Sequence, residues 1–329
     1  MKALVYGGPE ILAFRDVADP VPQAGQQLIK VLSVGICGSD MHAYLGHDDR
    51  RPAPLILGHE AAGEIVGGPR DGERVTVNPL VTCGTCKACQ SGHDNLCPER
   101  LIISMPPREG AFSQYVAMQD DNLVSVPDHV SLDAASLAEP IACGWHTVRL
   151  AKSALDGVAQ TALVIGGGAI GLGAALSLTA QGVPDVTIVE PNALRRDVLN
   201  NKCAQTAISP DDLPNGAQFD LVIDGVGYAA TRATASAHAR PGGVIGHIGL
   251  GEGTGGLDVR RMTLQEITFI GTYTYTAQDF RDTAAAIFDG RLGLLDWTEQ
   301  RPLSQGAAAF ADIRAGRTAA PKIILNPHS

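Results

Sequence analysis

The sequence lacks runs of five or more like charges, internal repeats and low-complexity tracts. A surface that tracks nucleic-acid phosphates needs clustered Lys and Arg side chains. The chain has 25 basic and 35 acidic residues, which gives a formal net charge of −10. Nucleic acid is therefore not an expected partner. Hydrophobic residues make up 45% of the chain and charged residues 18%, which excludes a largely disordered protein.

Signals for export or membrane insertion are also scarce. The first residues lack the long apolar core of a signal peptide, so we expect a cytoplasmic protein. One uncharged stretch, Thr161 to Ala180, is long enough to span a bilayer. Five glycines interrupt it and a β-rich segment follows, so a strand, a turn and a helix fit it better and no membrane partner is expected.

The length of 329 residues favours two domains. The part before Glu139 has short β-like runs, such as Leu28 to Val34 and Arg74 to Val77, separated by Gly and Pro turns. This pattern predicts a β-barrel-like domain. The later part alternates buried strands with helical stretches, which predicts a doubly wound α/β domain.

Four of the seven cysteines crowd into fifteen positions with the spacing C-x2-C-x2-C-x7-C. Four thiolates can close a tetrahedron around zinc, and the glycines among them let the backbone wrap closely. Disulfides or an iron–sulfur cluster are the alternatives, but the expected reducing compartment disfavours disulfides. The spacing therefore predicts a structural zinc site at Cys83, Cys86, Cys89 and Cys97.

A second set of metal-ligand residue types is spread along the chain as Cys37, His59, Glu60 and Glu139. Each alone is weak, because a single Cys or His is more often a packing or satisfied polar residue. One thiolate, one imidazole and one carboxylate, with a position left open, would make a chemically sensible catalytic zinc site.

A buried strand, Thr161 to Ile165, runs into a glycine-rich turn and a helix-compatible stretch, Ala169 to Ala180. The G-x-G-x-x-G motif is weak alone but specific in this strand, turn and helix context, where it binds a dinucleotide pyrophosphate at the helix N-terminus. The predicted cofactor-binding residues of this turn are Gly166, Gly168, Ile170 and Gly171.

The next strand, Asp185 to Val189, ends at Glu190, nineteen residues after Gly171. An acidic side chain there accepts hydrogen bonds from the adenosine ribose and repels a 2′-phosphate, which favours NAD over NADP. Arg195 is a further candidate cofactor-binding residue, placed either beside the adenine or merely at the start of a helix. Because Arg195 and Arg196 are positively charged and close to Glu190, binding of NADP stays an alternative. Further strands are predicted at Phe219 to Asp224 and Gly243 to Gly249.

The chain resembles the zinc-containing medium-chain dehydrogenase/reductases, and within them the sorbitol and polyol dehydrogenase branch. The resemblance rests on the Cys-Gly-Ser-Asp-x-His segment at 37–42, Gly-His-Glu at 58–60, the cysteine run, Glu-Pro at 139–140 and the glycine motif, in the family's order. It implies that Cys37 and His59 hold a catalytic zinc, with Glu139 as third ligand, direct or through a water, and Glu60 as another possible ligand. Cys143 is interpreted as a packing residue.

The resemblance also assigns roles around the catalytic zinc. Asp40 suits a hydrogen bond that fixes the tautomer of His59. Ser39 and His42 occupy the positions that carry the alcohol proton towards solvent in this family. Val226, Ile248 and Gly249 would lie near the nicotinamide.

The family's architecture implies a GroES-like β-barrel catalytic domain at 1–141 and 276–329, with the structural zinc lobe at about 78–100. A Rossmann NAD-binding domain at 142–275 would be inserted into it. Two zinc ions per chain, NAD and a homodimer or homotetramer are expected.

The implied reaction is hydride transfer between a secondary alcohol, such as a polyol or sugar alcohol, and NAD. Sorbitol dehydrogenases carry an arginine between two aromatics where this chain has Tyr273-Thr274-Tyr275, so sorbitol itself is not favoured. Tyr44, Tyr273 and Tyr275 are candidates to line the pocket or to pack in the core. Sugar-alcohol phosphates and simple secondary alcohols or diols are alternatives, as is a non-catalytic, nucleotide-binding or redox-sensing protein.

Overall fold

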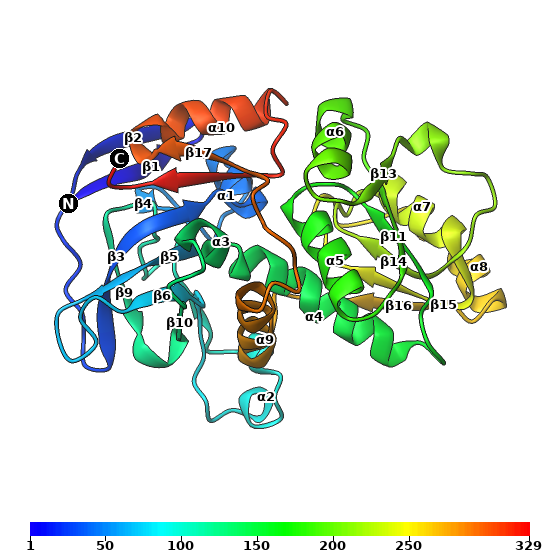
Figure 1. The fold of residues 1–329 in the computed structure, drawn as a ribbon, viewed down its shortest axis with the longest axis horizontal. Coiled ribbons are helices and arrows are strands. Elements are labelled where there is room, and N and C mark those ends of the chain that lie inside the picture. Colours follow the sequence, from blue (N-terminus) through cyan, green and yellow to red (C-terminus); the bar gives the residue numbers. More distant parts are fainter. The chain divides into compact units, whose positions relative to one another are not determined.

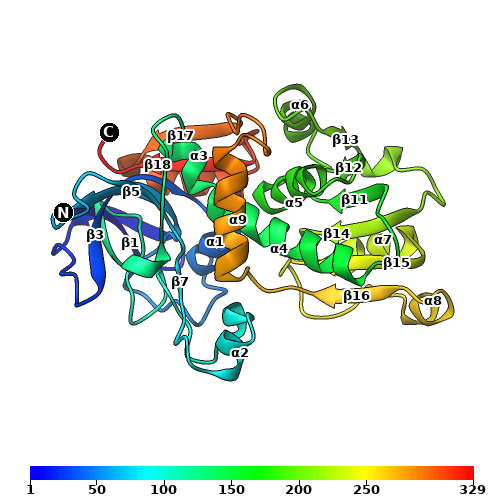
Figure 2. The same cartoon turned by 60° about the horizontal axis from the view of Figure 1, so that its bottom comes forward.

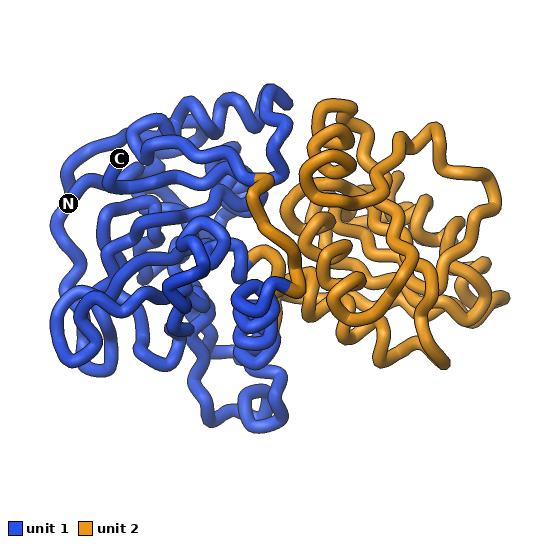
Figure 3. The backbone as a smooth tube through the Cα atoms, viewed as in Figure 1, with its two compact units in different colours: residues 1–139, 276–290, 298–329 blue, residues 140–275, 291–297 orange.

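A computed structural model describes all 329 residues. Contacts within the chain define two compact units, which Figure 3 colours separately. The first unit comprises Met1–Glu139, Thr276–Gly290 and Thr298–Ser329, and the second comprises Pro140–Tyr275 and Arg291–Trp297. The second unit also takes in 291–297, which the sequence prediction of 142–275 leaves out. The domain limits themselves stay a prediction.

The first unit is built on two larger sheets (Figure 1). One sheet has the order β2-β1-β4, and the other has the order β10-β6-β5-β3-β18-β17, with β9 also paired to β3. The strands are β1 (Lys2–Gly8), β2 (Ile11–Asp16), β3 (Gln26–Gly35), β4 (Leu55–Ile56), β5 (Glu60–Val66), β6 (Arg74–Val77), β9 (Tyr115–Gln119), β10 (Leu123–Ser125), β17 (Thr298–Pro302) and β18 (Lys322–Asn326).

Strand β3 organises this unit because it pairs with three other strands. Its inward side chains are fully or almost fully buried, as the alternating apolar pattern requires. The last strand of the chain, β18, pairs antiparallel with it, so that Ile324 lies opposite Gly35. This pairing brings the C-terminal strand beside the segment that leads into Cys37.

The core beneath these sheets is aliphatic and aromatic. Phe112 and Phe310 meet edge to face at 6.0 Å, and Tyr44 packs against Phe310 at 5.2 Å. Burying a side chain of this size stabilises a fold by about 1.5–3 kcal/mol. Tyr44 is therefore a core residue, with only 7% of its surface exposed.

The helices of the first unit are short and lie at its loops. They are α1 (Gly38–Tyr44), α2 (Lys87–Gln90), α3 (Leu132–Ser136), α9 (Ala277–Phe288) and α10 (Gly306–Arg314), and α4 (Ala138–Ala154) begins in this unit and continues into the second. Figure 2 shows α2 in a lobe that projects from the sheets of this unit. The hairpin of β7 (Leu80–Val81) and β8 (Leu101–Ile102) leads into and out of that lobe.

The second unit contains one six-stranded parallel sheet with the order β13-β12-β11-β14-β15-β16. This order is 3-2-1-4-5-6 along the chain, the doubly wound arrangement that the sequence predicts. Its elements are β11 (Thr161–Ile165), α5 (Ala169–Ala180), β12 (Asp185–Val189), α6 (Ala193–Asn201), β13 (Thr206–Ile208), β14 (Phe219–Asp224), α7 (Ala229–His238), β15 (Ala239–His247), α8 (Val259–Leu264) and β16 (Thr268–Gly271).

The predicted bounds hold for three of these strands and for α5. Strand β15 differs, because it begins at Ala239 and ends at His247, before Ile248 and Gly249. The uncharged stretch at 161–180 forms β11, the turn and α5, as expected. None of the helices has both the length and the apolar character needed to cross a membrane.

Candidate active site and metal centres

The four cysteines of the run meet in the lobe that carries α2. Their sulfur atoms all lie within 4.8 Å of one another, with Cys86 to Cys89 at 3.5 Å, Cys83 to Cys97 at 3.6 Å and Cys83 to Cys89 at 4.0 Å. Thiolates at about 2.3 Å from a tetrahedral zinc stand about 3.8 Å apart. The group therefore fits zinc, and all four thiols are free of disulfides.

Main-chain amides turn towards these sulfur atoms. Cys86 N–H donates to Cys83 Sγ at 3.3 Å, and Cys89 N–H donates to Cys86 Sγ at 3.5 Å. Amides at Thr85 and Cys86 lower the pKa of the Cys83 thiol to about 6, whereas burial raises the pKa of Cys89 to about 11. Cys83 is thus the more acidic of these two thiols. Because the thiolate is the form that binds metals, Cys83 is the more readily available ligand in the absence of metal.

A second group forms where α1 and β5 begin. Ligand atoms of Cys37, His59 and Glu60 all lie within 4.8 Å of one another. Cys37 occupies the position just before α1, and Glu60 is the first residue of β5. Gly58 precedes His59 with a φ of +89°, and a Cβ there would meet the Phe112 ring at 2.5 Å. Only glycine therefore brings the backbone into this turn.

Three side chains surround the His59 imidazole. Asp40 Oδ1 lies 3.5 Å from Nδ1, Ser104 Oγ lies 3.4 Å from Nδ1, and Ser39 Oγ lies 3.5 Å from Nε2. Asp40 is fully buried and accepts hydrogen bonds from the N–H groups of Cys37 and Gly58. It therefore joins the two chain segments that supply Cys37 and His59.

The charged residues of this group shift one another's pKa. Burial lowers the pKa of His59, but the negative charges of Asp40 and Cys37 outweigh it and hold that pKa well above its ordinary value. Burial raises the pKa of Asp40, and the neighbouring His59 and Arg51 lower it below its ordinary value. The donor set of thiolate, imidazole and carboxylate suits a cation such as zinc.

Glu60 has a partner that sequence reasoning missed. Lys322 Nζ donates to Glu60 Oε1 at 2.6 Å and to the Ile36 carbonyl at 2.9 Å, with both side chains buried. Glu60 Oε2 has no hydrogen-bond partner, and a Cβ on Gly35 would approach it to 2.0 Å. One carboxylate oxygen thus holds Lys322, while the other has no hydrogen-bond partner and is a candidate metal-binding atom. A single lysine at the start of an apolar strand gives no signal in the sequence.

The remaining predicted residues of this site, Glu139 and His42, differ in how far they are exposed to solvent. Glu139, in the first turn of α4, is buried but is not part of the three-residue group. Its negative charge helps to raise the pKa of Lys322 against the opposing effect of burial. His42 is exposed on α1. Cys143 lies outside both cysteine-containing groups. The roles of Glu139 and His42 stay predictions.

The glycine turn of the second unit has little room for side chains. A Cβ on Gly171 would lie 1.8 Å from the Gly166 carbonyl oxygen, and Gly166 has a φ of +96°. Gly168 stands at the N-terminus of α5, and the half-buried Ile170 is its second residue. The tight turn and the open helix terminus suit a pyrophosphate.

Glu190 lies directly against this turn. One carboxylate oxygen accepts a hydrogen bond from Gly167 N–H and the other from Asn192 N–H, each at 2.8 Å. Arg195 Nη1 lies 3.9 Å from the same carboxylate. Arg196 donates instead to the Glu190 carbonyl. The acidic charge is therefore fixed beside the glycine turn.

The loops after β14 and β15 meet next to each other. A Cβ on Gly249 would approach the Val226 carbonyl carbon to 2.1 Å. The Asp224 carbonyl accepts hydrogen bonds from both Ile248 and Gly249, and its carboxylate accepts them from Val226 and Gly227. The predicted nicotinamide residues are thus brought together at the carboxyl ends of adjacent strands, where ligands bind in such sheets.

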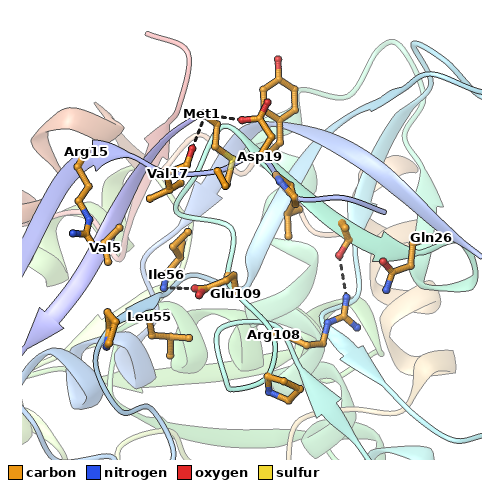
Figure 4. A pocket seen from close by; sticks show the side chains of 18 residues that line it. Met1, Val5, Arg15, Val17, Asp19, Gln26, Leu55, Ile56, Arg108 and Glu109 are labelled. Atoms are coloured by element: carbon orange, nitrogen blue, oxygen red, sulfur yellow. Dashed lines mark hydrogen bonds and ion pairs between the residues drawn. The ribbon is translucent and has the colours of Figure 1, made fainter. Parts of the chain in front are cut away.

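One cavity of the first unit, of about 500 Å³, lies elsewhere. It contains none of the predicted site residues, and most of its ionic groups are already bonded (Figure 4). The Met1 amino group pairs with Asp19, and Glu109 accepts a hydrogen bond from Ile56 N–H. This cavity offers no candidate catalytic group.

The doubly wound sheet with its glycine turn, in a chain that also carries two groups of candidate metal ligands, defines a class of protein. The protein is a zinc-dependent oxidoreductase that works with a nicotinamide dinucleotide.

Comparison with known proteins gives the family. Residues 23–128 match the alcohol dehydrogenase GroES-like domain, and residues 169–289 match the zinc-binding dehydrogenase domain. The chain is 31% identical to L-galactonate-5-dehydrogenase of Escherichia coli K12 over 89% of this chain and 88% of that protein. It is 33% identical to sorbitol dehydrogenase of Bacillus subtilis 168 over 84% of this chain and 82% of that protein.

Solved structures agree. The structure of an alcohol dehydrogenase from Escherichia coli CFT073, in complex with NADH, superposes on this chain with a TM-score of 0.88 and 26% sequence identity. The superposition covers 99% of each chain. The chain belongs to the zinc-containing medium-chain dehydrogenase/reductase family and is similar to its polyol dehydrogenases. The family resemblance, the fold class and the alcohol oxidoreductase activity predicted from the sequence are confirmed.

Proposed function

We propose that this protein oxidises a secondary hydroxyl group of a polyhydroxylated substrate to a ketone with NAD, and reduces the ketone in the reverse direction. The observation that carries the proposal is the group of half-buried Cys37 with buried His59 and Glu60, with Ser39 Oγ 3.5 Å from the His59 ring. The names of two relatives, a sugar-acid dehydrogenase and a sorbitol dehydrogenase, support a polyol, sugar alcohol or sugar acid as substrate.

Cys37 and His59 would hold the catalytic zinc, with a carboxylate from Glu139 or Glu60 completing the set. Glu60 already lies with them, and its partner-free Oε2 supports it as a ligand. Glu139 remains the ligand that the family resemblance implies. Bound zinc would supply a Lewis acid that makes the substrate hydroxyl more acidic.

Ser39 and His42 would carry the hydroxyl proton to solvent. They stand three residues apart on α1 and therefore on one face of the helix. Ser39 is half-buried beside His59, whereas His42 is exposed, which supports a path from the inside to the outside. Asp40 would hold the imidazole of His59 in one orientation.

NAD would bind with its pyrophosphate on the turn of Gly166, Gly168 and Gly171 and its adenosine ribose at Glu190. A 2′-phosphate would meet the fixed charge of Glu190, which supports a preference for NAD. Arg195, 3.9 Å from that carboxylate, would lie near the adenine. Val226, Ile248 and Gly249 would line the nicotinamide.

A second zinc in the four-cysteine group would have a structural role, because its four ligands leave no position for a substrate. We also propose a homodimer or homotetramer. The edge strand β16 and the exposed side chains Leu250, Val259 and Leu264 of the same unit support an association surface. The seven free thiols support a cytoplasmic location.

An NADH-absorbance screen tests the proposed reaction. The substrates are polyols, sugar acids, sugar-alcohol phosphates, simple secondary alcohols and diols, each with NAD and with NADP. We expect turnover of a polyol or sugar acid with NAD. Turnover of phosphates or simple alcohols alone would move the substrate class to the alternatives. No turnover of any alcohol by zinc-loaded protein would favour a non-catalytic nucleotide-binding protein.

A further inference from the structure

A buried arginine, Arg51, contacts the two chain segments that flank His59. Arg51 has only 3% of its surface exposed. Its Nε donates a hydrogen bond to the Ser104 carbonyl at 3.0 Å, and its Nη1 donates to the Ser39 carbonyl at 3.1 Å. The same Nη1 lies 2.9 Å from the Asp48 carboxylate, which balances its charge. The guanidinium thus ties two distant segments of the chain together.

These two segments stand on either side of the His59 ring. Ser39 places its hydroxyl 3.5 Å from Nε2, and Ser104 places its hydroxyl 3.4 Å from Nδ1. Ser39 belongs to α1, whereas Ser104 follows β8, 65 positions further along the chain. Arg51 bonds to both segments and so restricts the distance between them.

Ser104 is held in an unusual backbone conformation. Its φ is +70°, in the left-handed region that non-glycine residues avoid, and it is fully buried. Such a conformation persists only when surrounding contacts fix it. The hydrogen bond from Arg51 to the Ser104 carbonyl is one of these contacts, and its result is a hydroxyl directed at His59.

The chemistry of arginine suits this task. Its planar guanidinium presents donors at fixed angles and stays charged at every pH that a protein survives. A lysine in its place has one nitrogen on a flexible stem and cannot reach two separated carbonyl groups with the same geometry. A neutral residue would also leave Asp48 without one of its two cationic partners, Arg51 and Arg50.

We propose that Arg51 is a positioning residue for the catalytic centre. By joining the Ser39 and Ser104 carbonyl groups, it fixes the two hydroxyls that flank His59, and so the orientation of the imidazole toward the metal. Ser104 acts in the same unit as a second hydrogen-bond partner of His59 Nδ1, beside Asp40. This inference rests on the proposed metal-dependent alcohol oxidation.

Cobalt substitution tests the proposal without relying on turnover. The full-length protein is loaded with Co²⁺, and the visible absorption of its Cys37→Ser variant is subtracted, which leaves the bands of the catalytic position. We expect Arg51→Gln to shift and weaken these bands. It should also lower kcat by about 10- to 100-fold with little change in KM for NAD, the usual effect of losing a partner of a metal-ligating His.

Two further variants keep the test decisive. Arg51→Lys should recover part of the cobalt bands and part of kcat, because it retains the charge and one hydrogen bond. Ser104→Gly removes the hydroxyl and relieves the positive φ, so it should fold well and still shift the bands in the same direction. If Arg51→Gln does not fold, these two variants decide the question.

Arg74→Gln is the matched control. Arg74 also donates to two main-chain carbonyl groups of the first unit, those of Pro127 and Val130, but it is not part of the site. Its loss should lower stability and leave the cobalt bands unchanged. Wild-type bands and kcat in folded Arg51 and Ser104 variants would overturn the proposal, as would cobalt bands that do not depend on Cys37. Cobalt bands that respond to Arg51 in a protein that oxidises no alcohol would overturn only the proposed function.

Discussion

Lys322 Nζ lies 2.6 Å from Glu60 Oε1, in a contact that joins the last strand of the chain to the first residue of β5 beside His59. Lys322 is 4% exposed and Glu60 is fully buried. Breaking a buried pair leaves an uncompensated charge in a medium that solvates it poorly. The C-terminal strand is therefore coupled electrostatically to the candidate metal group of Cys37, His59 and Glu60.

Lys322→Met tests this coupling through stability. We expect the free energy of unfolding to fall by about 3–5 kcal/mol, because removing one partner of a buried ion pair leaves the other without compensation. Urea unfolding measures the change. The double variant Lys322→Met with Glu60→Gln should lose less than Lys322→Met alone, since the uncompensated charge is then gone.

The exposed pair of Lys2 and Asp16 provides the control for that experiment. Its N···O distance is 2.7 Å, close to that of the buried pair, but its side chains are 45% and 78% exposed. Lys2→Met should lower the free energy of unfolding far less than Lys322→Met, because solvent screens an exposed ion pair. A loss in Lys322→Met no larger than in Lys2→Met would show that the buried pair does not support the fold.

Ser39 and His42 should differ in how much their loss slows turnover. Ser39→Ala removes the hydroxyl next to His59, so kcat should fall by about 10² to 10⁴-fold. His42 is exposed, so water and buffer can take over its part, and His42→Ala should lose less and recover as buffer concentration rises. Steady-state kinetics over a buffer series checks both. A Ser39→Ala variant with the wild-type kcat would exclude the relay.

Glu190 should control the choice of dinucleotide. Glu190→Gln keeps an oxygen that can accept the Gly167 N–H bond but removes the charge that would repel a 2′-phosphate under the proposed mode of binding. We expect kcat/KM for NADP to rise relative to NAD by about tenfold, which corresponds to about 1.4 kcal/mol. Ala193→Ser, at the start of α6, is a neighbouring control. An unchanged ratio in Glu190→Gln would assign the preference to other residues.

Removal of zinc should expose a difference in reactivity within the four-cysteine group. The Cys83 thiol, with a pKa of about 6, is largely thiolate at pH 7, whereas Cys89, with a pKa of about 11, stays protonated. Cys83 is also exposed. After chelation, brief treatment with iodoacetamide should label Cys83 first, and the difference should shrink below pH 6 as Cys83 becomes protonated.

Peptide mass spectrometry reads out this labelling. The zinc-loaded protein is the control and should be labelled slowly, because the metal occupies the thiolates. Cys203, which is buried with a pKa of about 12 because burial raises it, should stay unmodified in both samples. Faster labelling of Cys89 than of Cys83 would contradict the expected order.

The sequence predicts those features that local spacing determines. The four cysteines fall within fifteen positions, and the strand, glycine turn and helix at 161–180 are contiguous. Their geometry follows from short loops and regular elements. The grouping of Cys37 with His59 and Glu60 is less local, and only the family's order of motifs indicated it.

Residues that act through long-range contacts left no pattern. Lys322 reaches Glu60 across 262 positions, and Arg51 reaches Ser104 across 53. A single buried Lys or Arg cannot be told from a surface residue in one sequence, because its partners lie far away along the chain. Tyr44 shows another limit, since the sequence left it as a residue of the pocket or of the core, and only its packing against Phe310 shows that it lies in the core.

The central claim is that Cys37 holds a metal on which alcohol oxidation by NAD depends. Its most direct test compares NADH formation by wild type and Cys37→Ser on the best substrate of the screen, with NAD binding measured on both by fluorescence titration. We predict that Cys37→Ser loses turnover and the catalytic metal but binds NAD as the wild type does. Full turnover in Cys37→Ser would contradict the account.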